Sequence, residues 1–317
     1  MNLNLPENCI KLLGASCTDK TWKQYNSCLN KYINFCNEKC VNPWKPEINI
    51  ILQFLTSLYE QGLSYVSLNT TRSALSTFLG DVEGQSIGCH PLVTRLIKGV
   101  SRLRPQTPKY ESTWDASQVL VLLKSWQNND TLDLSKLSMK LVSLLALCSA
   151  QRVQTLCSIK LPDIEFTNDN TVNIKIYDRL KTSKPGSVFE MNFSKFSDSK
   201  LCIVRCIRCY IDRTQSVRDS EYLLISSRSP YKKVSSQTVS NWLKKILNES
   251  GIDSSKFGSH SFRHSSTSKA SSLGISTDVI FKSAGWSSKS KVFGRFYNRP
   301  IIKCNEFANA ILSSSRM

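Results

Sequence analysis

His260-Ser-Phe-Arg263 opens the stretch of sequence that decides the fold, and Ala284-Gly-Trp286 and Phe296-Tyr297-Asn-Arg-Pro300 complete it. On a helix His260 and Arg263 lie on one face, because positions i and i+3 are neighbours. Arginine offers a planar fork of donors that suits phosphate oxygens, and histidine can move a proton near neutral pH. A tyrosine close to such a pair indicates a nucleophile.

Two further cationic positions lie upstream of this stretch. Arg152 follows the apolar run 141–147, so it is expected at the end of a buried helix. The segments 172–177 and 187–191 alternate apolar and polar residues, which predicts two half-buried strands. A Pro-Gly turn signal lies between them, close to Lys181 and Lys184. We therefore expect a β-hairpin that carries a lysine.

Taken together and in this order, the residues resemble the tyrosine recombinases of the phage-integrase family. That family has an arginine after a buried helix, a lysine on a β-hairpin, a His-x-x-Arg motif, a tryptophan or histidine, and a tyrosine. The resemblance implies the following catalytic residues: Arg152, Lys181 (with Lys184 as the alternative), His260, Arg263, Trp286 and Tyr297. His264, next to the motif, is expected to point off the catalytic face and is left out of the set.

The resemblance also implies the roles of these residues. Tyr297 would attack a DNA phosphate to give a 3′-phosphotyrosine, and Arg152 and Arg263 would stabilise the charge that builds in the transition state. Lys181 would protonate the leaving 5′-oxygen as general acid. His260 would assist proton transfer, and the indole N–H of Trp286 would donate to a phosphate oxygen. This chemistry implies no metal and no cofactor.

The implied function is that of a site-specific DNA recombinase or integrase. Several phrases, such as Gln-Arg-Val-Gln-Thr-Leu at 151–156, look most like recombinases of Crypton-type or DIRS-like mobile elements. Two alternatives stay open: a domesticated, catalytically inactive DNA-binding protein with the same fold, and a type IB topoisomerase-like activity. The sequence does not identify the target site, the host, accessory factors or a bias between integration and excision.

The composition agrees with a nucleic-acid partner. The 317 residues include 42 Lys and Arg against 24 Asp and Glu, a formal net charge of +18. Such a balance favours a polyanionic partner, and the family resemblance implies that this partner is double-stranded DNA. Residues 114–317 carry 30 of the basic and 16 of the acidic residues, so the half with the candidate catalytic residues is the more basic one.

Other classes of protein fit the sequence poorly. No run of 18 or more apolar residues occurs, which argues against a membrane span, and the N-terminus lacks the pattern of a signal peptide. We expect an intracellular protein, in the nucleus if it comes from a eukaryotic mobile element. The twelve cysteines lack the paired spacing of a zinc site and are expected to be small buried hydrophobes.

The chain is predicted to have two domains. In residues 18–103, apolar residues recur at three- and four-residue steps in four segments, which predicts an all-α bundle within a domain 1–103. That stretch resembles the SAM-like core-binding domain of the family. Residues 104–113 contain two prolines and are interpreted as a linker. Residues 114–317 are expected to form the catalytic domain.

The second domain is predicted to be mixed α+β, with a small antiparallel sheet among helices. Helices are expected near 135–149, 203–212, 235–247, 260–273 and 277–283, with a possible short strand at 222–226. Tyr297 would lie on or next to a last helix, which Pro300 interrupts. The tail 301–312 has an apolar face. The family resemblance implies that it packs into a neighbouring subunit, giving dimers and then a tetramer on DNA.

Overall fold

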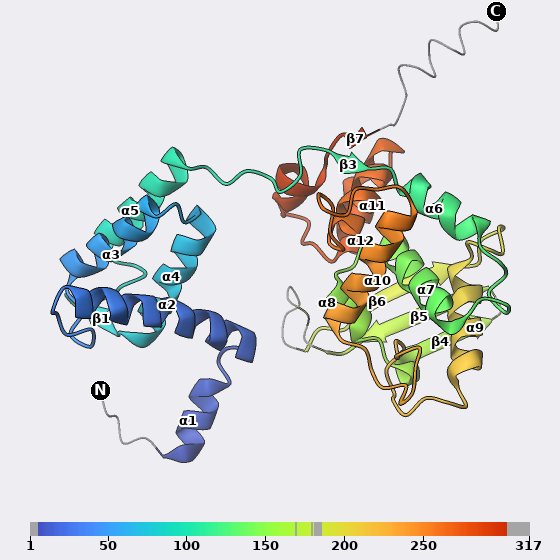
Figure 1. Ribbon diagram of the computed structural model, residues 1–317, viewed down its shortest axis with the longest axis horizontal. Helices are drawn as coiled ribbons and strands as arrows, with labels where there is room; N and C mark the ends of the chain where they lie inside the picture. Colours follow the sequence, from blue (N-terminus) through green and yellow to red (C-terminus); the bar gives the residue numbers. More distant parts are fainter. Residues whose placement is uncertain (1–5, 169, 179, 181–185, 303–317) are drawn as a thin grey trace, which may run out of the picture. The chain divides into compact units, whose positions relative to one another are not determined.

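The chain folds as two compact units, Met1–Thr107 and Pro108–Met317 (Figure 1). The computed structural model describes residues 6–168, 170–178, 180 and 186–302. The segment expected as a linker, 104–113, includes Tyr110 and Thr113, and both are buried in the second unit. The backbone therefore joins the second core several residues before the expected start at 114.

The first unit contains the four predicted helices and three elements that were not predicted. Side chains of Thr18 and Ser64 accept hydrogen bonds from backbone N–H groups three residues later, which fixes where α2 and α4 begin. A short helix precedes the bundle, and a two-stranded hairpin joins α4 to α5. The elements are α1 (Glu7–Gly14), α2 (Asp19–Glu38), α3 (Ile48–Glu60), α4 (Tyr65–Phe78), β1 (Asp81–Val82), β2 (Gln85–Ser86) and α5 (Pro91–Leu103).

The core of this unit forms from the residues whose spacing predicted the helices. One apolar stripe of each helix is buried, and Tyr32 packs edge-on against Phe54 with ring centres 5.3 Å apart. The buried members of the predicted sets are Leu29, Tyr32, Cys36, Ile51, Leu55, Leu58, Leu68, Thr71, Leu75, Val93, Ile97 and Val100.

The second unit is a cluster of helices around one almost fully buried helix. This central helix is α7 (Leu134–Ser149), and it packs against α9, α10 and α11. Asp133 is its N-cap residue, because the Asp133 carboxylate accepts a hydrogen bond from Lys136 N–H. The helices around it are α6 (Ala116–Ser125), α8 (Val153–Cys157), α9 (Ile203–Thr214), α10 (Ser236–Glu249), α11 (Ser261–Ser272) and α12 (Thr277–Ala284), with a 3₁₀ turn at Leu161–Asp163.

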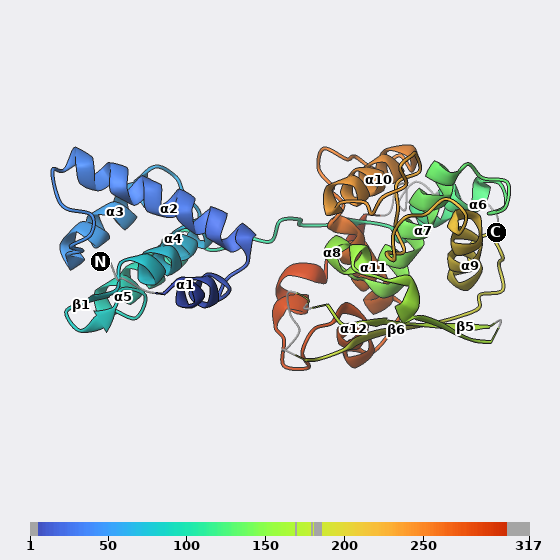
Figure 2. The ribbon, with the colours of Figure 1, turned by 90° about the horizontal axis from the view of Figure 1, so that it is seen from below.

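A three-stranded antiparallel sheet lies against these helices. Its order is β4 (Ile164–Asn168), β5 (Thr171–Ile176) and β6 (Phe189–Ser194), with Ile174 opposite Met191. Figure 2 shows the sheet edge-on, with α7 and α9 on one side of it. The predicted hairpin is thus confirmed as β5 and β6. The strand proposed at 222–226 was wrong, because there Tyr222 and Ile225 make only isolated bridges, to Lys160 and Lys233.

A short parallel pairing ties the two ends of the second unit together. β3 (Thr113–Trp114) pairs with β7 (Ile301–Ile302), and Thr113 N–H donates to the carbonyl of Pro300. The indole of Trp114 donates to Ser261 Oγ at 2.8 Å. The backbone that follows Tyr297 is therefore held beside the first turn of α11. Among the described residues, no helix is long and apolar enough to cross a bilayer.

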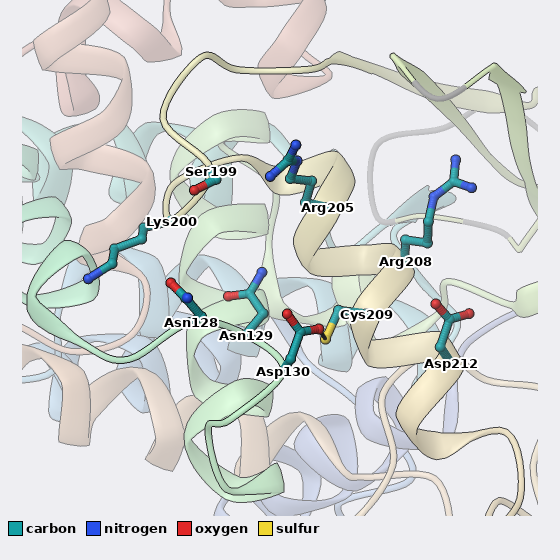
Figure 3. Close-up of a pocket in the computed structure, with 9 residues that line it drawn as sticks. All are labelled: Asn128, Asn129, Asp130, Ser199, Lys200, Arg205, Arg208, Cys209 and Asp212. Carbon is teal, nitrogen blue, oxygen red and sulfur yellow. Dashed lines mark hydrogen bonds between the residues drawn. The ribbon is translucent and has the colours of Figure 1, made fainter.

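One lysine is enclosed in the core of the second unit. Lys140 on α7 is fully buried, and its Nζ has no hydrogen-bond partner among the described residues. Burial lowers the pKa of this amine. Two of the groups whose charge acts on it, Lys200 and Cys209, line a polar surface pocket along α9 (Figure 3).

We predict that Lys140→Met increases the free energy of unfolding by about 1–3 kcal/mol, because an unsatisfied buried amine is replaced by an apolar chain of similar length. Denaturant unfolding would measure the change. Lys244→Met, at an exposed position on α10, is the matched control and should change little. A loss of stability in Lys140→Met would show that the amine contributes a favourable interaction.

Candidate active site

The centre of the candidate site is a buried guanidinium. Arg263 lies in the first turn of α11 and is 1% exposed. Its Nη1 donates to the carbonyl of Ala150 at 2.6 Å, but Nε and Nη2 have no partner among the described residues. Burial, followed by the charge of Arg152, lowers the pKa of Arg263 to about 10, so the group is still cationic at neutral pH. Two unsatisfied donors on a buried cation are suited to an anion.

The turn at the end of α7 brings Arg152 close to Arg263. Ala150 adopts a left-handed conformation with φ of 52°, which reverses the chain after Ser149. Arg152 then precedes α8 as its N-cap residue and is half-buried. No hydrogen bond or ion pair joins its guanidinium to another described residue. Two like charges in proximity repel, so an anion bound between them would lower the energy of the site.

Tyr297 and His260 are in direct contact. His260 Nε2 and Tyr297 Oη are 2.7 Å apart and share a hydrogen bond. Tyr297 ends a five-residue π-helical turn, Phe293–Tyr297, and is 8% exposed. Its carbonyl accepts from Ser268 Oγ at 2.8 Å, and that hydroxyl also accepts from Arg299 N–H at 3.0 Å. The tyrosine is therefore fixed through both its backbone and its hydroxyl.

Trp286 closes one side of the site. The Arg263 guanidinium carbon lies 4.2 Å from the centre of a Trp286 ring, within the range of a cation–π contact. The Trp286 and Tyr297 rings are 4.8 Å apart at 60°. The indole Nε1 is buried and has no partner among the described residues. It is therefore a third unsatisfied donor next to Arg263.

A glycine and a glutamine place the Trp286 loop. Gly285 ends α12 with φ of 65°, and a side chain there would come within 3.4 Å of the ring of Phe189 on β6. Gln151 Nε2 donates to the carbonyl of Ser283 at 2.5 Å. The residue before Arg152 thus ties the tryptophan loop to the end of α7, and β6 begins next to the same loop.

The structure brings Arg152, His260, Arg263, Trp286 and Tyr297 together, as five of the six predicted positions. The sixth, Lys181, and its alternative Lys184 lie outside the described residues. Among the described residues, no cluster of three or more His, Cys, Asp or Glu side chains is close enough to hold a metal ion.

The expectation for His264 was wrong. Its ring stacks on Tyr297 with centres 4.2 Å apart and an angle of 17° between planes, and it is 4% exposed. His264 directly follows Arg263, so its side chain is expected to point away from the face that carries Arg263. His264 is, however, four residues after His260, and i and i+4 share a face. That spacing was the signal that sequence reasoning missed.

The environment of His264 disfavours its charged form. Burial, followed by the charges of His260, Arg299, Arg263 and Lys109, lowers the pKa of His264 to about 3. Its Nδ1 is buried and has no partner among the described residues. The imidazole is therefore neutral in the folded protein at pH 7.

We predict a specific dependence of stability on pH. Below pH 6.5 the unfolded chain protonates His264, whereas the folded protein does not until about pH 3. The free energy of unfolding therefore falls as the pH falls, by about 1.4 kcal/mol per pH unit between pH 6 and 4 from this group. His264→Phe should remove that part of the slope in denaturant titrations. Parallel curves for the two proteins would contradict the buried neutral imidazole.

The sequence and the fold of the chain were compared with those of known proteins. No curated protein sequence matches the chain. Similar solved structures include the XerH recombinase bound to palindromic difH substrate, in a post-cleavage complex. That match has a TM-score of 0.59 and 13% identity, and covers 92% of this chain and 78% of that chain.

A lambda integrase dimer bound to a COC′ core site is similar at TM-score 0.56 and 19% identity, over 91% of this chain and 75% of that chain. The Tn1549 transposon integrase in complex with transposon right end DNA matches with a TM-score of 0.52 and 12% identity. That match covers 86% of this chain and 85% of that chain. Identities this low show a common fold alone. Residues 113–300, more than half of the chain, match the sequence model of the Phage integrase family, and the chain belongs to that family.

Proposed function

We propose that the chain is a site-specific DNA recombinase that cuts and rejoins double-stranded DNA through a covalent 3′-phosphotyrosine at Tyr297. The observation that carries the proposal is the hydrogen bond between Tyr297 and His260, next to the buried Arg263, whose Nε and Nη2 have no partner among the described residues. A candidate nucleophile, a candidate proton acceptor and a candidate anion site are therefore adjacent.

The proposed cleavage step uses each of these groups once. Tyr297 Oη attacks the phosphorus as its bond to the 5′-oxygen of the next nucleotide breaks. A phenol has a pKa near 10, so His260 takes up its proton as the bond forms. Arg152 and Arg263 stabilise the non-bridging oxygens, and Trp286 Nε1 donates to one of them. Lys181 gives the proton that the leaving 5′-oxygen needs.

Rejoining is the reverse of cleavage. A 5′-hydroxyl attacks the phosphotyrosine, and the phenol leaves and recovers its proton. The free energy of the broken phosphodiester is kept in the protein–DNA bond, so no nucleotide cofactor is required. Exchange of partners between the two steps is recombination, whereas rejoining to the same strand relaxes supercoils as a type IB topoisomerase does.

The biological role that we propose is movement of a mobile element. The phrases that resemble Crypton-type and DIRS-like recombinases support it, as does the likeness in fold to a transposon integrase in complex with transposon right end DNA. We propose that the first unit, predicted as residues 1–103, is the core-binding domain. The second unit, predicted to start at 114 but starting at Pro108, is proposed as the catalytic domain, with the duplex contacted by both.

We also propose that copies of the chain assemble on DNA through the C-terminal tail. Residues 303–317 lie outside the described residues, but the second unit has an apolar groove that suits an apolar helix. Several of its residues are exposed, including Leu273 at 68% and Val279 at 55%. The groove is lined by Ala116, Leu120, Leu147, Leu273, Ile275, Val279 and Ile280, among others.

We predict that Val279→Asp abolishes assembly of dimers and tetramers on DNA, because a carboxylate in the groove opposes burial of an apolar tail. Val121→Asp, at an exposed position of α6 that is not in the groove, is the matched control. Light scattering of protein–DNA complexes would measure the assembly. If Val279→Asp assembles like the control, the groove does not receive the tail.

The covalent intermediate is tested with nicked suicide duplexes. Sites would first be selected by the protein from a randomised pool of duplexes. Nicks moved one nucleotide at a time would then allow the short 5′-hydroxyl fragment to diffuse away after cleavage. We expect wild-type protein to become attached to the 3′ side of the cut, whereas Tyr297→Phe keeps the ring and forms no adduct.

Either of two results would contradict the assignment. An adduct that persists in Tyr297→Phe would identify another nucleophile. Specific binding without any adduct at any nick position would favour the inactive DNA-binding relative. Relaxation of supercoiled plasmid without strand exchange between two sites would favour the topoisomerase.

A further inference from the structure

We infer that His264 is a positioning residue for Tyr297, holding the phenol by a face-to-face ring stack so that its hydroxyl stays on His260. This inference rests on the proposed function for its consequence in catalysis. Its structural basis is independent of that proposal and lies in the packing around one aromatic ring.

The first observation is the geometry around Tyr297. Among the described residues, three rings contact it, and only His264 does so face to face, at 4.2 Å and 17°. His260 and Trp286 approach at steeper angles, with ring centres at 5.7 Å and 4.8 Å. A face-to-face contact with a buried partner opposes tilting of the tyrosine ring out of its plane, and the two edge contacts oppose its movement within that plane.

The second observation is that His264 is itself held in place. It sits on α11 four residues after His260, so one helix carries both the stacking ring and the hydrogen-bond partner of Tyr297. The ring of Tyr110 packs edge-on against His264, at 5.0 Å and 89°, and Phe257 packs against Tyr110 at 5.3 Å. The stack therefore rests on a buried row of aromatic rings.

The third observation concerns charge. The depressed pKa of His264 keeps the imidazole neutral, so it adds no further cation beside Arg263 and Arg299. A proton carrier needs a pKa near the working pH, and His264 does not have one. Its contribution to Tyr297 is therefore made through the face of the ring.

The test compares two substitutions that differ in the ring face. His264→Phe keeps an aromatic face of similar size, and His264→Leu removes it while keeping an apolar side chain. Single-turnover cleavage would be measured on a nicked suicide duplex selected by the wild-type protein, together with affinity for the intact duplex. Phe262→Leu is the control, since Phe262 is a buried ring on the same helix that packs on Trp114.

We expect His264→Phe to cleave at a rate close to wild type. His264→Leu should cleave roughly 100-fold more slowly, the size of effect expected when a nucleophile is misplaced by about 1 Å. Its affinity for DNA should be unchanged, and Phe262→Leu should lose thermal stability without losing cleavage rate. Equal rates for the Leu and Phe variants, or a loss confined to DNA affinity, would overturn the inference.

A second measurement does not depend on activity. In protein labelled with ¹³C-tyrosine, the ring signals of Tyr297 are identified by their loss in Tyr297→Phe. A stacked neighbour shifts these signals upfield. The shift should persist in His264→Phe and decrease in His264→Leu to the part that the Trp286 and His260 rings contribute. If wild-type protein forms no adduct with DNA, the proposed function fails, and this shift still decides whether the stack exists. An unshifted Tyr297 in wild type would overturn it.

Discussion

The unsatisfied guanidinium of Arg263 is the constraint on which the second unit depends. This cation is 1% exposed, Nη1 donates to a carbonyl, and Nε and Nη2 have no partner within the part of the chain that the structure describes, so it is costly to bury. Part of this cost is offset because α7 ends in a left-handed turn at Ala150, whose carbonyl accepts a hydrogen bond from Arg263 Nη1. The same turn places Arg152 next to Arg263. A phosphate would satisfy both guanidiniums and the Trp286 indole.

The second feature of the site is how firmly Tyr297 is held. Its hydroxyl shares a hydrogen bond with His260, and its carbonyl accepts one from Ser268. Its ring packs against the rings of Trp286 and His264. Four residues later, at Ile301, the chain pairs with β3. Nearly all of these contacts come from α11 or from the loop after α12. The start of α11 thus carries Arg263, His260 and His264, and the loop after α12 adds Trp286.

Much of the site could be predicted from the sequence because its signals are local. His260 and Arg263 are one helical turn apart, and the strands around Lys181 alternate with a period of two. The apolar stripes of the first unit likewise gave its helices. The burial of Arg263 was not predictable, because it depends on contacts with Ala150, more than 100 residues earlier in the chain.

The remaining misses have similar physical causes. The pairing of β3 with β7 involves two residues on each side and leaves no periodic signal. Ala150 takes a left-handed conformation that alanine rarely adopts, so nothing marks the turn in the sequence. Tyr110, within the expected linker, is fixed by packing on Phe257 and His264. Each case is decided by tertiary contacts.

The most direct test of the account removes the charge that Arg263 is proposed to neutralise. Arg263→Ala would be assayed on the selected suicide duplex with a normal phosphate, and on the same duplex with a neutral methylphosphonate at the scissile position. We expect the variant to form no adduct with the phosphate duplex and to regain adduct formation with methylphosphonate, because no charge then needs to be stabilised. Equal failure on both duplexes, with the variant folded and bound, would contradict the role of Arg263 as the anion site.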